Sequence, residues 1–406
     1  MKRTRIAAAA LALSTLAAVP ALSALSALPA LGATAVATPA VAATQPTQAV
    51  PPINEAALKQ AIAGLPAPDA TAAEVRVGGS AGSWHGVSGV RDLTSERPAR
   101  DGMRFRAGSV TKMFTTAVVL QLVAEGKVAL DDAVQDHLPG LLPAAYPRIT
   151  VGQLLNHTSG LPAPKLPGDL ATVYATRFKV WTPEEYVARA VANPIEFTPG
   201  TRQHYLNINT FVAGMLIEKI TGRSYEHEVT TRILRPVGMR DSYLPGRSVQ
   251  VRGPHNRGYQ VVPEGFPDAR PYGDAYVVDM TVGSVTSTWA SGDLISTTAD
   301  LERFVTALFK GEIVPPAQLE PMFTVPDVKQ HGTGDPATYT SGMSRLVLPG
   351  GIVAYGKTGA RYGSAAGVGA TRDLARTVVY SINSTDAKAA GQNQRGLAVA
   401  LAAFAK

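Results

Sequence analysis

The sequence predicts an α/β protein of the α+β type, in which both ends of the chain build one α/β domain around a mainly helical insertion. Residues Glu74–Val90 alternate and are rich in Val, Gly and Ser, which predicts two antiparallel strands joined near Gly79–Gly82. Near the other end, Gly351–Tyr355 and Thr377–Ile382 are β-branched or aromatic runs typical of strands, with a Gly-rich connection between them. Between these regions lie short helices and Pro/Gly loops. We therefore expect the α/β domain to comprise residues 54–130 and 290–406, and the insertion residues 131–289.

Helix starts and ends are marked by capping residues. Thr182, Pro183 and Glu185 supply an N-cap, a proline at the first helical position and a glutamate two residues further on. Gly126 and Gly222 follow apolar helical runs and predict their ends. The expected elements are a helix at Asn54–Ala63 with Ala56, Leu58 and Ile62 facing inward, a short strand at Arg104–Ala107, helices from Ser109 and from Thr182, an apolar helix at Phe211–Ile220, a helix at Leu301–Phe309 after Thr297, and an Ala-rich helix at Asp386–Lys406.

The N-terminus has the pattern of an export signal. Lys2, Arg3 and Arg5 precede an apolar run, small-residue cleavage sites follow, and no acidic residue occurs before Glu55. An uncleaved membrane anchor is the alternative, but the uncharged stretch is interrupted by Pro20, Pro29, Gly32 and Pro39. We therefore expect a signal peptide at residues 1–42, a linker at 43–53, and a secreted, extracellular protein with no stable membrane span after cleavage.

Charge and cysteine content exclude several functions. The chain has 38 Lys and Arg against 31 Asp and Glu, a net charge of +7, and without the three cations of the signal the balance is 35 minus 31, or +4. No basic cluster with interleaved aromatics is present, so nucleic acid binding is not expected. The absence of cysteine excludes disulfides, thiol catalysis and Cys-ligated metals. Tyr225–Glu228 lacks the i, i+4 histidine pair of a zinc helix, so no metal or other cofactor is expected.

Ser109 and Lys112 form the first chemical motif. Residues three apart share a helical face, so the Ser109 hydroxyl and the Lys112 amine can point into one pocket. A serine hydroxyl needs an adjacent base, and a lysine can be that base only if burial or nearby positive charge lowers its pKa. The helix N-terminus also offers backbone N–H groups to a developing oxyanion.

Two later motifs complete the groups that acyl transfer requires. Tyr205 and Asn207 lie in a loop just before an apolar helix, and the run Gly356–Gly359 ends the predicted strand Gly351–Tyr355. Acyl transfer needs a nucleophile, a proton shuttle, an oxyanion site and a cation for an anionic substrate. Lys112 and Tyr205 can move protons, whereas the third motif supplies Lys357 and Thr358, which can anchor a carboxylate.

Two competing interpretations are weaker. Residues 351–358 fit the P-loop pattern letter for letter, but their variable positions are strand formers and Gly359 follows, so nucleotide binding is not expected. His157 invites a Ser-His-Asp interpretation, but a lone histidine in a turn more often has a structural hydrogen bond.

The three ordered motifs resemble those of penicillin-recognising serine hydrolases, S-x-x-K, Y-x-N and K-T-G. The resemblance covers about residues 55–385, includes Leu154–Leu161, Val212–Lys219 and Ile295–Leu301, and is closest to secreted actinomycete D-alanyl-D-alanine carboxypeptidases and class C β-lactamase-like hydrolases. It implies an antiparallel sheet flanked by helices, with a mainly helical insertion. It also implies that Ser109 forms an acyl-enzyme with Lys112 and Tyr205 as the general acid/base pair. The binding residues that it implies are Asn207 for the substrate amide, Lys357 and Thr358 for its carboxylate side, the backbone N–H groups of Ser109 and Ala360 as oxyanion hole, and Trp289 as an aromatic wall.

Three positions depart from the carboxypeptidase pattern. Ala360 stands where those enzymes have a threonine whose hydroxyl helps to bind the terminal carboxylate. They also use an arginine in the strand before the third motif, for which Arg345 is the candidate and Arg361 the alternative. Leu206 stands where serine is usual, which affects pocket polarity more than proton transfer.

The expected function is a secreted serine hydrolase, foremost a D-alanyl-D-alanine carboxypeptidase on peptidoglycan stem peptides, with β-lactams as inhibitors or substrates. A class C-like β-lactamase, an esterase or a D-amino-acid amidase would share the same site and differ in deacylation rate or acyl group. A non-catalytic protein that binds cell-wall peptides or β-lactams is the alternative of another class. The intact Lys112, Tyr205 and Lys357 favour an enzyme.

Overall fold

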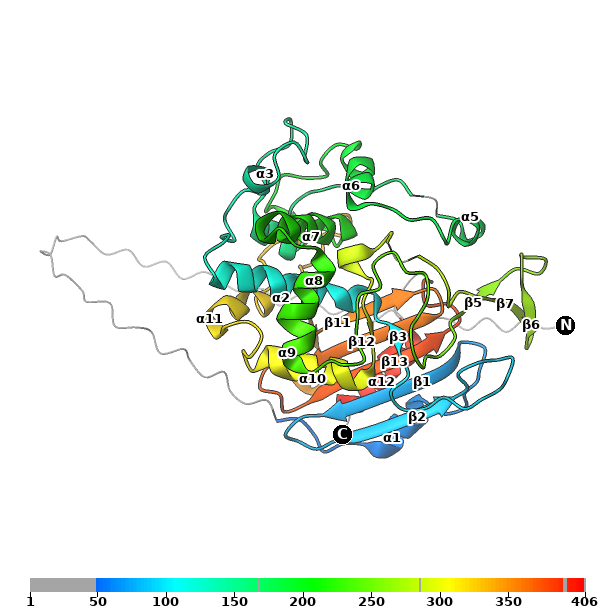
Figure 1. The fold of residues 1–406 in the computed structure, drawn as a ribbon. Coiled ribbons are helices and arrows are strands. Elements are labelled where there is room, and N and C mark those ends of the chain that lie inside the picture. Colours follow the sequence, from blue (N-terminus) through cyan, green and yellow to red (C-terminus); the bar gives the residue numbers. More distant parts are fainter. Residues whose placement is uncertain (1–48, 167, 285, 390–392, 405–406) are drawn as a thin grey trace, which may run out of the picture. The chain divides into compact units, whose positions relative to one another are not determined.

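The computed structural model describes residues 49–404 apart from 167, 285 and 390–392 (Figure 1). The predicted signal peptide, and the linker up to residue 48, therefore lie outside the described residues. The described residues belong to one compact unit. Within the described part of the chain, no helix has both the length and the apolar character needed to cross a membrane.

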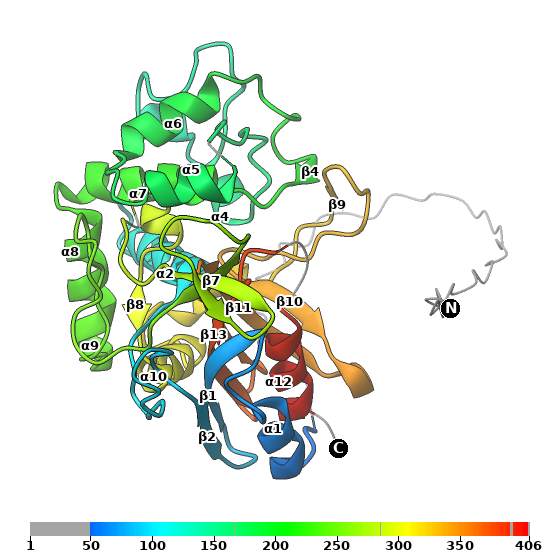
Figure 2. The ribbon, with the colours of Figure 1, turned by 90° about the vertical axis from the view of Figure 1, so that its right-hand side faces the viewer.

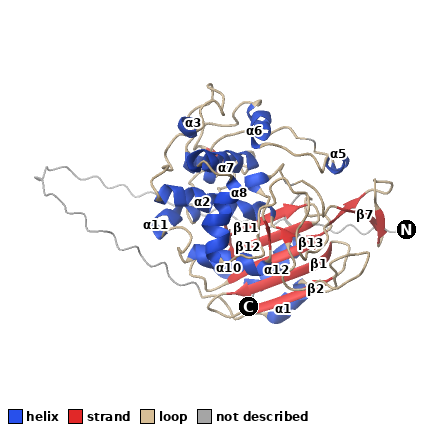
Figure 3. Ribbon diagram, viewed as in Figure 1, coloured by secondary structure: helices blue, strands red, loops and turns tan. Residues whose placement is uncertain are grey.

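A six-stranded antiparallel sheet joins the two ends of the chain (Figure 3). The N-terminal hairpin adds to the C-terminal meander because β1 pairs with β13, with Val75 opposite Tyr380. The strand order is β10-β11-β12-β13-β1-β2, which confirms the predicted fold class. The strands are β1 (Ala70–Gly78), β2 (Trp84–Gly89), β10 (Ser344–Val347), β11 (Val353–Arg361), β12 (Ser364–Ala370) and β13 (Thr377–Ser384).

Helices cover both faces of this sheet (Figure 2). Helices α1 (Glu55–Ala61) and α12 (Gln394–Phe404) pack on one face, and α2 (Thr111–Ala124) and α10 (Thr298–Phe309) lie on the other. Strand alternation explains the two cores, because Val378 and Tyr380 belong to the first and Val379 to the second. Leu58 and Ile62 of the first helical segment are buried as predicted, whereas Ala56 is exposed.

The third motif corrects the predicted strand boundaries. Residues Gly356–Gly359 lie inside β11 and do not end it, and the Gly-rich connection that follows is largely strand β12. Glycine is required here by close approach: a Cβ on Gly359 would lie 2.0 Å from Ala107 O, and one on Gly367 would lie 2.3 Å from the Tyr380 ring. The C-terminal helix also begins later than predicted, at Gln394.

Helix α2 runs through the centre of the larger core. Nearly every residue of the helix is buried, which is typical of a helix surrounded by other elements. Its Phe114 ring stacks on Phe304 of α10 with centroids 3.7 Å apart. It is preceded by the 3-10 turn η1 (Gly108–Val110) and by strand β3 (Phe105–Arg106), which pairs with β8 (Ile295–Ser296).

The insertion contains short helices and, against expectation, a three-stranded sheet of order β5-β7-β6. The predicted capping box is present, with the Thr182 hydroxyl accepting from Glu185 N, and Gly222 ends α7 with a φ of +67°.

The remaining elements of the chain, inside and outside the insertion, are α3 (Val134–His137), α4 (Val151–Leu155), α5 (Leu170–Ala175), α6 (Pro183–Val191), β4 (Arg202–Gln203), α7 (Asn207–Thr221), α8 (Tyr225–Val229), a π-helix at Thr230–Leu234, α9 (Arg235–Val237), β5 (Tyr259–Val262), β6 (Arg270–Tyr272), β7 (Ala275–Asp279), η3 (Trp289–Ser291), α11 (Pro316–Leu319), η4 (Glu320–Met322), β9 (Lys329–Gln330) and η5 (Pro349–Gly351).

Candidate active site

Lys112 lies at the centre of the site and is fully buried. Its Nζ is 3.3 Å from Ser109 Oγ, 2.8 Å from Asn207 Oδ1 and 2.9 Å from the Ser291 carbonyl oxygen. A neutral amine has two N–H donors and one lone pair. Because the two oxygens of Asn207 and Ser291 can only accept, they take both donors and leave the lone pair for the Ser109 hydroxyl. The contacts therefore suit an amine that accepts the serine proton.

The surroundings of Lys112 favour its neutral form. Burial lowers its pKa well below the ordinary value for lysine, and the positive charges of Lys357 and Lys388 lower it further. No carboxylate of the described chain forms an ion pair with this amine to counteract that shift. A lysine in these conditions can act as a general base near neutral pH.

Tyr205 lies between the two lysines of the motifs. Its ring centroid is 5.0 Å from Lys112 Nζ and 4.6 Å from Lys357 Nζ, and the ring stacks on Tyr339 at 4.6 Å. The hydroxyl is buried without a hydrogen-bond partner of good geometry among the described residues. Burial raises the pKa of this phenol, although its nearness to Ser109 acts in the opposite direction. The pKa values of the two groups that can move protons are thus shifted in opposite directions. The lowered pKa suits Lys112 as a base, and the raised pKa suits Tyr205 as an acid.

Lys357 and Thr358 lie on β11 at the other side of Tyr205. Lys357 is 6% exposed, and its Nζ donates to the Thr358 carbonyl oxygen at 3.1 Å. Burial lowers the pKa of Lys357 to about 8. The Thr358 side chain is exposed. A cation and a hydroxyl beside the nucleophile suit the binding of an anionic group.

The backbones of η1 and β11 meet at the nucleophile. A Cβ on Gly108 would lie 2.7 Å from Ala360 N, and a Cβ on Gly359 would lie 2.8 Å from Ser109 N. This close approach brings together the Ser109 and Ala360 peptide groups, which are the two predicted oxyanion donors. Gly108 also has a φ of +53°, a conformation that favours glycine.

The two remaining predicted substrate residues, Trp289 and Arg345, differ in burial. Trp289 is 7% exposed, donates from Nε1 to Glu226 Oε1 at 3.1 Å, and packs against Phe211. Arg345 is exposed on the edge strand β10, where it pairs with Tyr355, two residues before Lys357 on β11. Arg361, the alternative arginine, does lie beside the site, with Nη1 3.3 Å from Thr288 Oγ1.

Other residues at the site carry no sequence motif that would have revealed them. The Ser291 carbonyl and the Tyr339 ring reach the site from distant segments. Their contacts depend only on the fold. His157 is buried beneath Tyr205, with ring centroids 4.7 Å apart, and its Nδ1 lies 3.3 Å from Asn209 Nδ2. It therefore supports the tyrosine as a packed turn residue.

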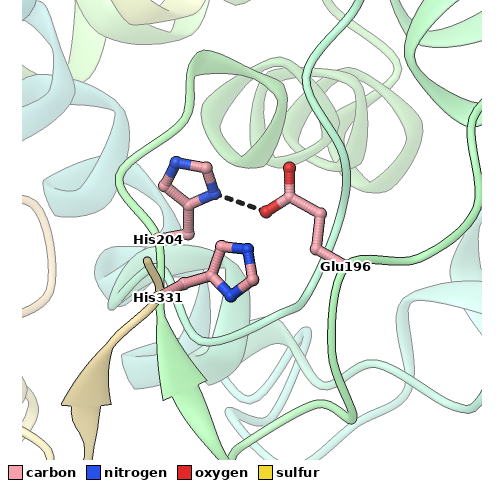
Figure 4. Close-up of side chains that lie close together, drawn as sticks. All are labelled: Glu196, His204 and His331. Carbon is pink, nitrogen blue, oxygen red and sulfur yellow. Dashed lines mark hydrogen bonds and ion pairs between the residues drawn. The ribbon is translucent and has the colours of Figure 1, made fainter. Parts of the chain in front are cut away.

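A cluster of Glu196, His204 and His331 lies beside the segment that leads to Tyr205 (Figure 4). Strands β4 and β9 pair in parallel, so the histidines that directly follow them lie side by side, with ring centroids 5.2 Å apart. Glu196 Oε2 bonds His204 Nδ1 directly. One ligand atom from each side chain lies within 4.8 Å of the others, a donor set that a divalent metal could use. The direct contact between Glu196 and His204 also fixes the backbone before Tyr205.

Comparison with known proteins gives one family. A family model described as "Beta-lactamase" matches residues 58–401. The chain is 33% identical over 166 residues to esterase EstB of Burkholderia gladioli, a match that covers 38% of this chain and 42% of that protein. It is 26% identical over 245 residues to penicillin-binding protein 4* of Bacillus subtilis, covering 59% of this chain and 52% of the relative. These matches span about half the length of the two curated relatives.

Solved structures resemble this chain over most of its length. A D-stereospecific amidohydrolase from Streptomyces sp. superposes with a TM-score of 0.72 at 32% identity, covering 84% of this chain and 97% of that one. The D-amino acid amidase from Ochrobactrum anthropi SV3, solved with D-phenylalanine, has a TM-score of 0.72 at 24% identity, covering 86% of this chain and 97% of its own. The second likeness concerns the fold alone.

Proposed function

The chain belongs to the beta-lactamase family of serine hydrolases, and on that premise we propose that Ser109 is the nucleophile of an acyl-enzyme reaction. The observation that carries the proposal is the hydrogen bonding of Lys112. Two acceptors hold the N–H groups of its amine, and the remaining lone pair faces Ser109 Oγ at 3.3 Å. Burial, the largest cause of the lowered pKa, keeps that amine neutral.

The proposed reaction has two stages. Lys112 takes the proton of Ser109 Oγ while the oxygen attacks the substrate carbonyl, and the N–H groups of Ser109 and Ala360 bind the resulting oxyanion. Tyr205, whose raised pKa keeps it protonated, donates to the leaving nitrogen as its bond to the acyl carbon breaks, and is reprotonated from Lys112. Water then attacks the acyl-enzyme by the same route in reverse and releases the acid.

We propose peptides with D-configured residues as the substrate class, and D-alanyl-D-alanine carboxypeptidase activity on peptidoglycan stem peptides as the activity to test first. Lys357 and Thr358 offer a cation and a hydroxyl to a terminal carboxylate. The similarity to a D-stereospecific amidohydrolase supports the preference for D-residues. The basic and apolar N-terminus supports secretion, which such a substrate requires.

Hydrolysis of D-amino-acid amides or esters is the second candidate, and particular residues favour it. Ala360 lacks the hydroxyl expected of a carboxypeptidase, and Arg345 is exposed on the edge strand β10 with no hydrogen bond or ion pair of its side chain among the described residues to fix it. Lys357 and Thr358 are the predicted carboxylate-binding residues on β11, the strand that meets the backbone of Ser109. A substrate without a terminal carboxylate would not require the missing groups.

A substrate panel with a Ser109→Ala control tests the proposal. Purified protein is given a diacyl-L-Lys-D-Ala-D-Ala peptide, D- and L-phenylalanine amides and a chromogenic cephalosporin, and intact mass is followed after addition of a penicillin. Release of D-alanine with a penicillin adduct at Ser109 supports the carboxypeptidase. Turnover of the D-amide alone supports the amidase, and consumption of the β-lactams without an adduct indicates a β-lactamase. Activity or acylation that persists in Ser109→Ala would refute the proposed reaction. An adduct that forms with no turnover of any substrate would also refute it, and would favour a binding protein.

A further inference from the structure

A cavity of about 260 Å³ adjoins the catalytic groups at Asn207. Asn207 belongs to both, because it lines the cavity and its Oδ1 is 2.8 Å from Lys112 Nζ. The far walls come from the loop after α5, from the segment around Gly283 and from the end of β11. Apart from Asn207, the residues that we propose for the reaction do not line this cavity.

The charged side chains among the described lining residues of the cavity are all cationic. Its described lining residues include five cations and no Asp or Glu, the cations being Arg106, Arg177, Lys179, Arg361 and Lys388. Over the described part of the chain, none of the five lies within ion-pair distance of a carboxylate. Asp293 acts on Arg361 at longer range, but burial raises the pKa of this carboxyl well above its ordinary value and favours its neutral form.

Two of these cations, the buried Arg106 and the half-buried Arg361, are incompletely hydrogen-bonded. Arg106 is 8% exposed, and its Nη1 has no partner among the described residues. Its Nη2 is fixed by carbonyl oxygens, including Thr281 O at 2.9 Å. Arg361 likewise has a buried Nε without a partner. Burial lowers the pKa of Arg106 to about 10, and repulsion from Arg361 adds to that effect, so the two guanidinium groups lie close enough to repel. An anion close to both groups would offset the repulsion.

The direction of β11 places this cavity on the acyl side of the substrate. The strand passes the nucleophile from Lys357 to Arg361, four residues, or about 13 Å at 3.3 Å per residue. Lys357 and Thr358 lie at the end proposed for the leaving group. Arg361 lies beyond Ala360, at the opposite end, where the acyl part of an extended substrate would lie.

We propose that this cavity selects acyl donors that carry a carboxylate on the acyl side of the scissile bond. Arg361 and Arg106 form the inner part of the anion site, and Lys388 and Lys179, both exposed, lie at its rim. Trp181, Tyr186 and Met280 supply apolar wall for the chain that connects the carboxylate to the reacting carbonyl. The inference deepens the proposed function and depends on it for the position of the scissile bond.

The test uses two thioesters that differ only in charge. One carries an N-succinyl-D-alanyl acyl group, and the other its succinamoyl isostere, in which a carboxamide replaces the carboxylate. Neither has a carboxylate on the leaving group. Wild-type kcat/KM should favour the anionic thioester by roughly 10- to 100-fold at low ionic strength, the range expected for one or two charge-assisted hydrogen bonds. The preference should decrease as salt is added, because part of the site is exposed.

Variants locate the effect. Arg361→Gln should lower the preference by about tenfold, and Lys388→Gln by a smaller factor because the rim is screened by solvent. Arg240→Gln and Lys329→Gln, which remove exposed cations outside the cavity, are the matched controls and should leave the preference unchanged. An unaltered rate on the neutral thioester shows that a variant is folded. Equal kcat/KM for both thioesters in the wild type, or a preference that Arg361→Gln and Lys388→Gln leave intact, would overturn the inference.

A binding measurement separates this inference from the proposed reaction. Isothermal titration of Ser109→Ala with the two hydrolysed acids, N-succinyl-D-alanine and its succinamoyl isostere, does not depend on turnover. Tighter binding of the succinyl compound would support the anion site even if neither thioester were hydrolysed, which would refute the reaction alone. Turnover of both thioesters with equal binding of the two acids would refute the anion site and leave the reaction standing.

Discussion

Replacing Lys357 by methionine should stabilise the protein at neutral pH while it weakens substrate binding. Lys357 is 6% exposed, and burial lowers its pKa from 10.5 to about 8. A difference of about 2.5 pH units corresponds to about 3 kcal/mol of unfavourable free energy for the charged form in the folded state. The lost hydrogen bond to Thr358 O and the cation–π contact with Tyr205 offset about 1–2 kcal/mol of the gain.

The pH dependence separates the charge effect from the lost contacts. Because the pKa is lowered on folding, the unfolded chain binds more protons than the folded chain between about pH 8 and 10.5. The stability of the wild type relative to Lys357→Met should therefore rise with pH across this window, by about 3 kcal/mol in total. Below about pH 8 the full penalty is present, and above 10.5 it is absent.

Urea unfolding of both proteins at pH 7, 8, 9 and 10 measures this difference. Comparison with the variant removes the contributions of other titrating groups, because these are shared. Lys329→Gln, which removes an exposed lysine charge on β9, is the control for loss of a lysine. The free energy of unfolding of the wild type relative to Lys357→Met could instead stay constant from pH 7 to 10, or fall with pH. Either result would refute the conclusion that burial destabilises the charged form of Lys357.

Three further outcomes are expected. Lys112→Ala should lower kcat/KM on the neutral thioester to within about tenfold of Ser109→Ala, because nucleophile and base act as a unit; a mild loss would exclude Lys112 as the base. Gly359→Ala places a Cβ 2.0 Å from Ala107 O. It should cost about 1–3 kcal/mol in urea unfolding and lower kcat by about 100-fold or more as β11 moves from Ser109 N, so wild-type kcat would contradict the geometry. Trp289→Phe should lower stability by about 1–2 kcal/mol and change KM less than about threefold, since Trp289 is a core residue; a large rise in KM would restore its role as a cleft wall.

The order of the motifs and the fold class could be predicted because both depend on local patterns. The spacing of Ser109 and Lys112 on a helix and the β-branched run of β13 are visible in the sequence alone. The boundaries of β11 and β12 could not be predicted, since glycines that usually mark loops are required there by contacts with Ala107 and Tyr380, far apart in the sequence.

The same limit applies to the individual residues of the site. Trp289 and Arg345 were placed by resemblance, and the direction of each side chain depends on packing that no motif encodes. The Ser291 carbonyl, which takes one of the two N–H groups of Lys112, is a backbone atom that any residue could supply. The sequence showed Arg361 as an alternative arginine. That Arg361 and Arg106 line the same cavity could be seen only in the folded structure.

One set of positive charges affects both the base and the proposed substrate site. Lys388 lines the cavity and is also one of the two cations that lower the pKa of Lys112. An anionic acyl group bound there would partly cancel the effect of Lys388 on the base. Burial, however, is the largest cause of the lowered pKa and does not depend on the anion. A bound substrate that excludes water would increase the burial of Lys112 and so lower its pKa further. The base can therefore remain neutral while the cavity binds a carboxylate, because desolvation and not charge repulsion keeps the proton off Lys112.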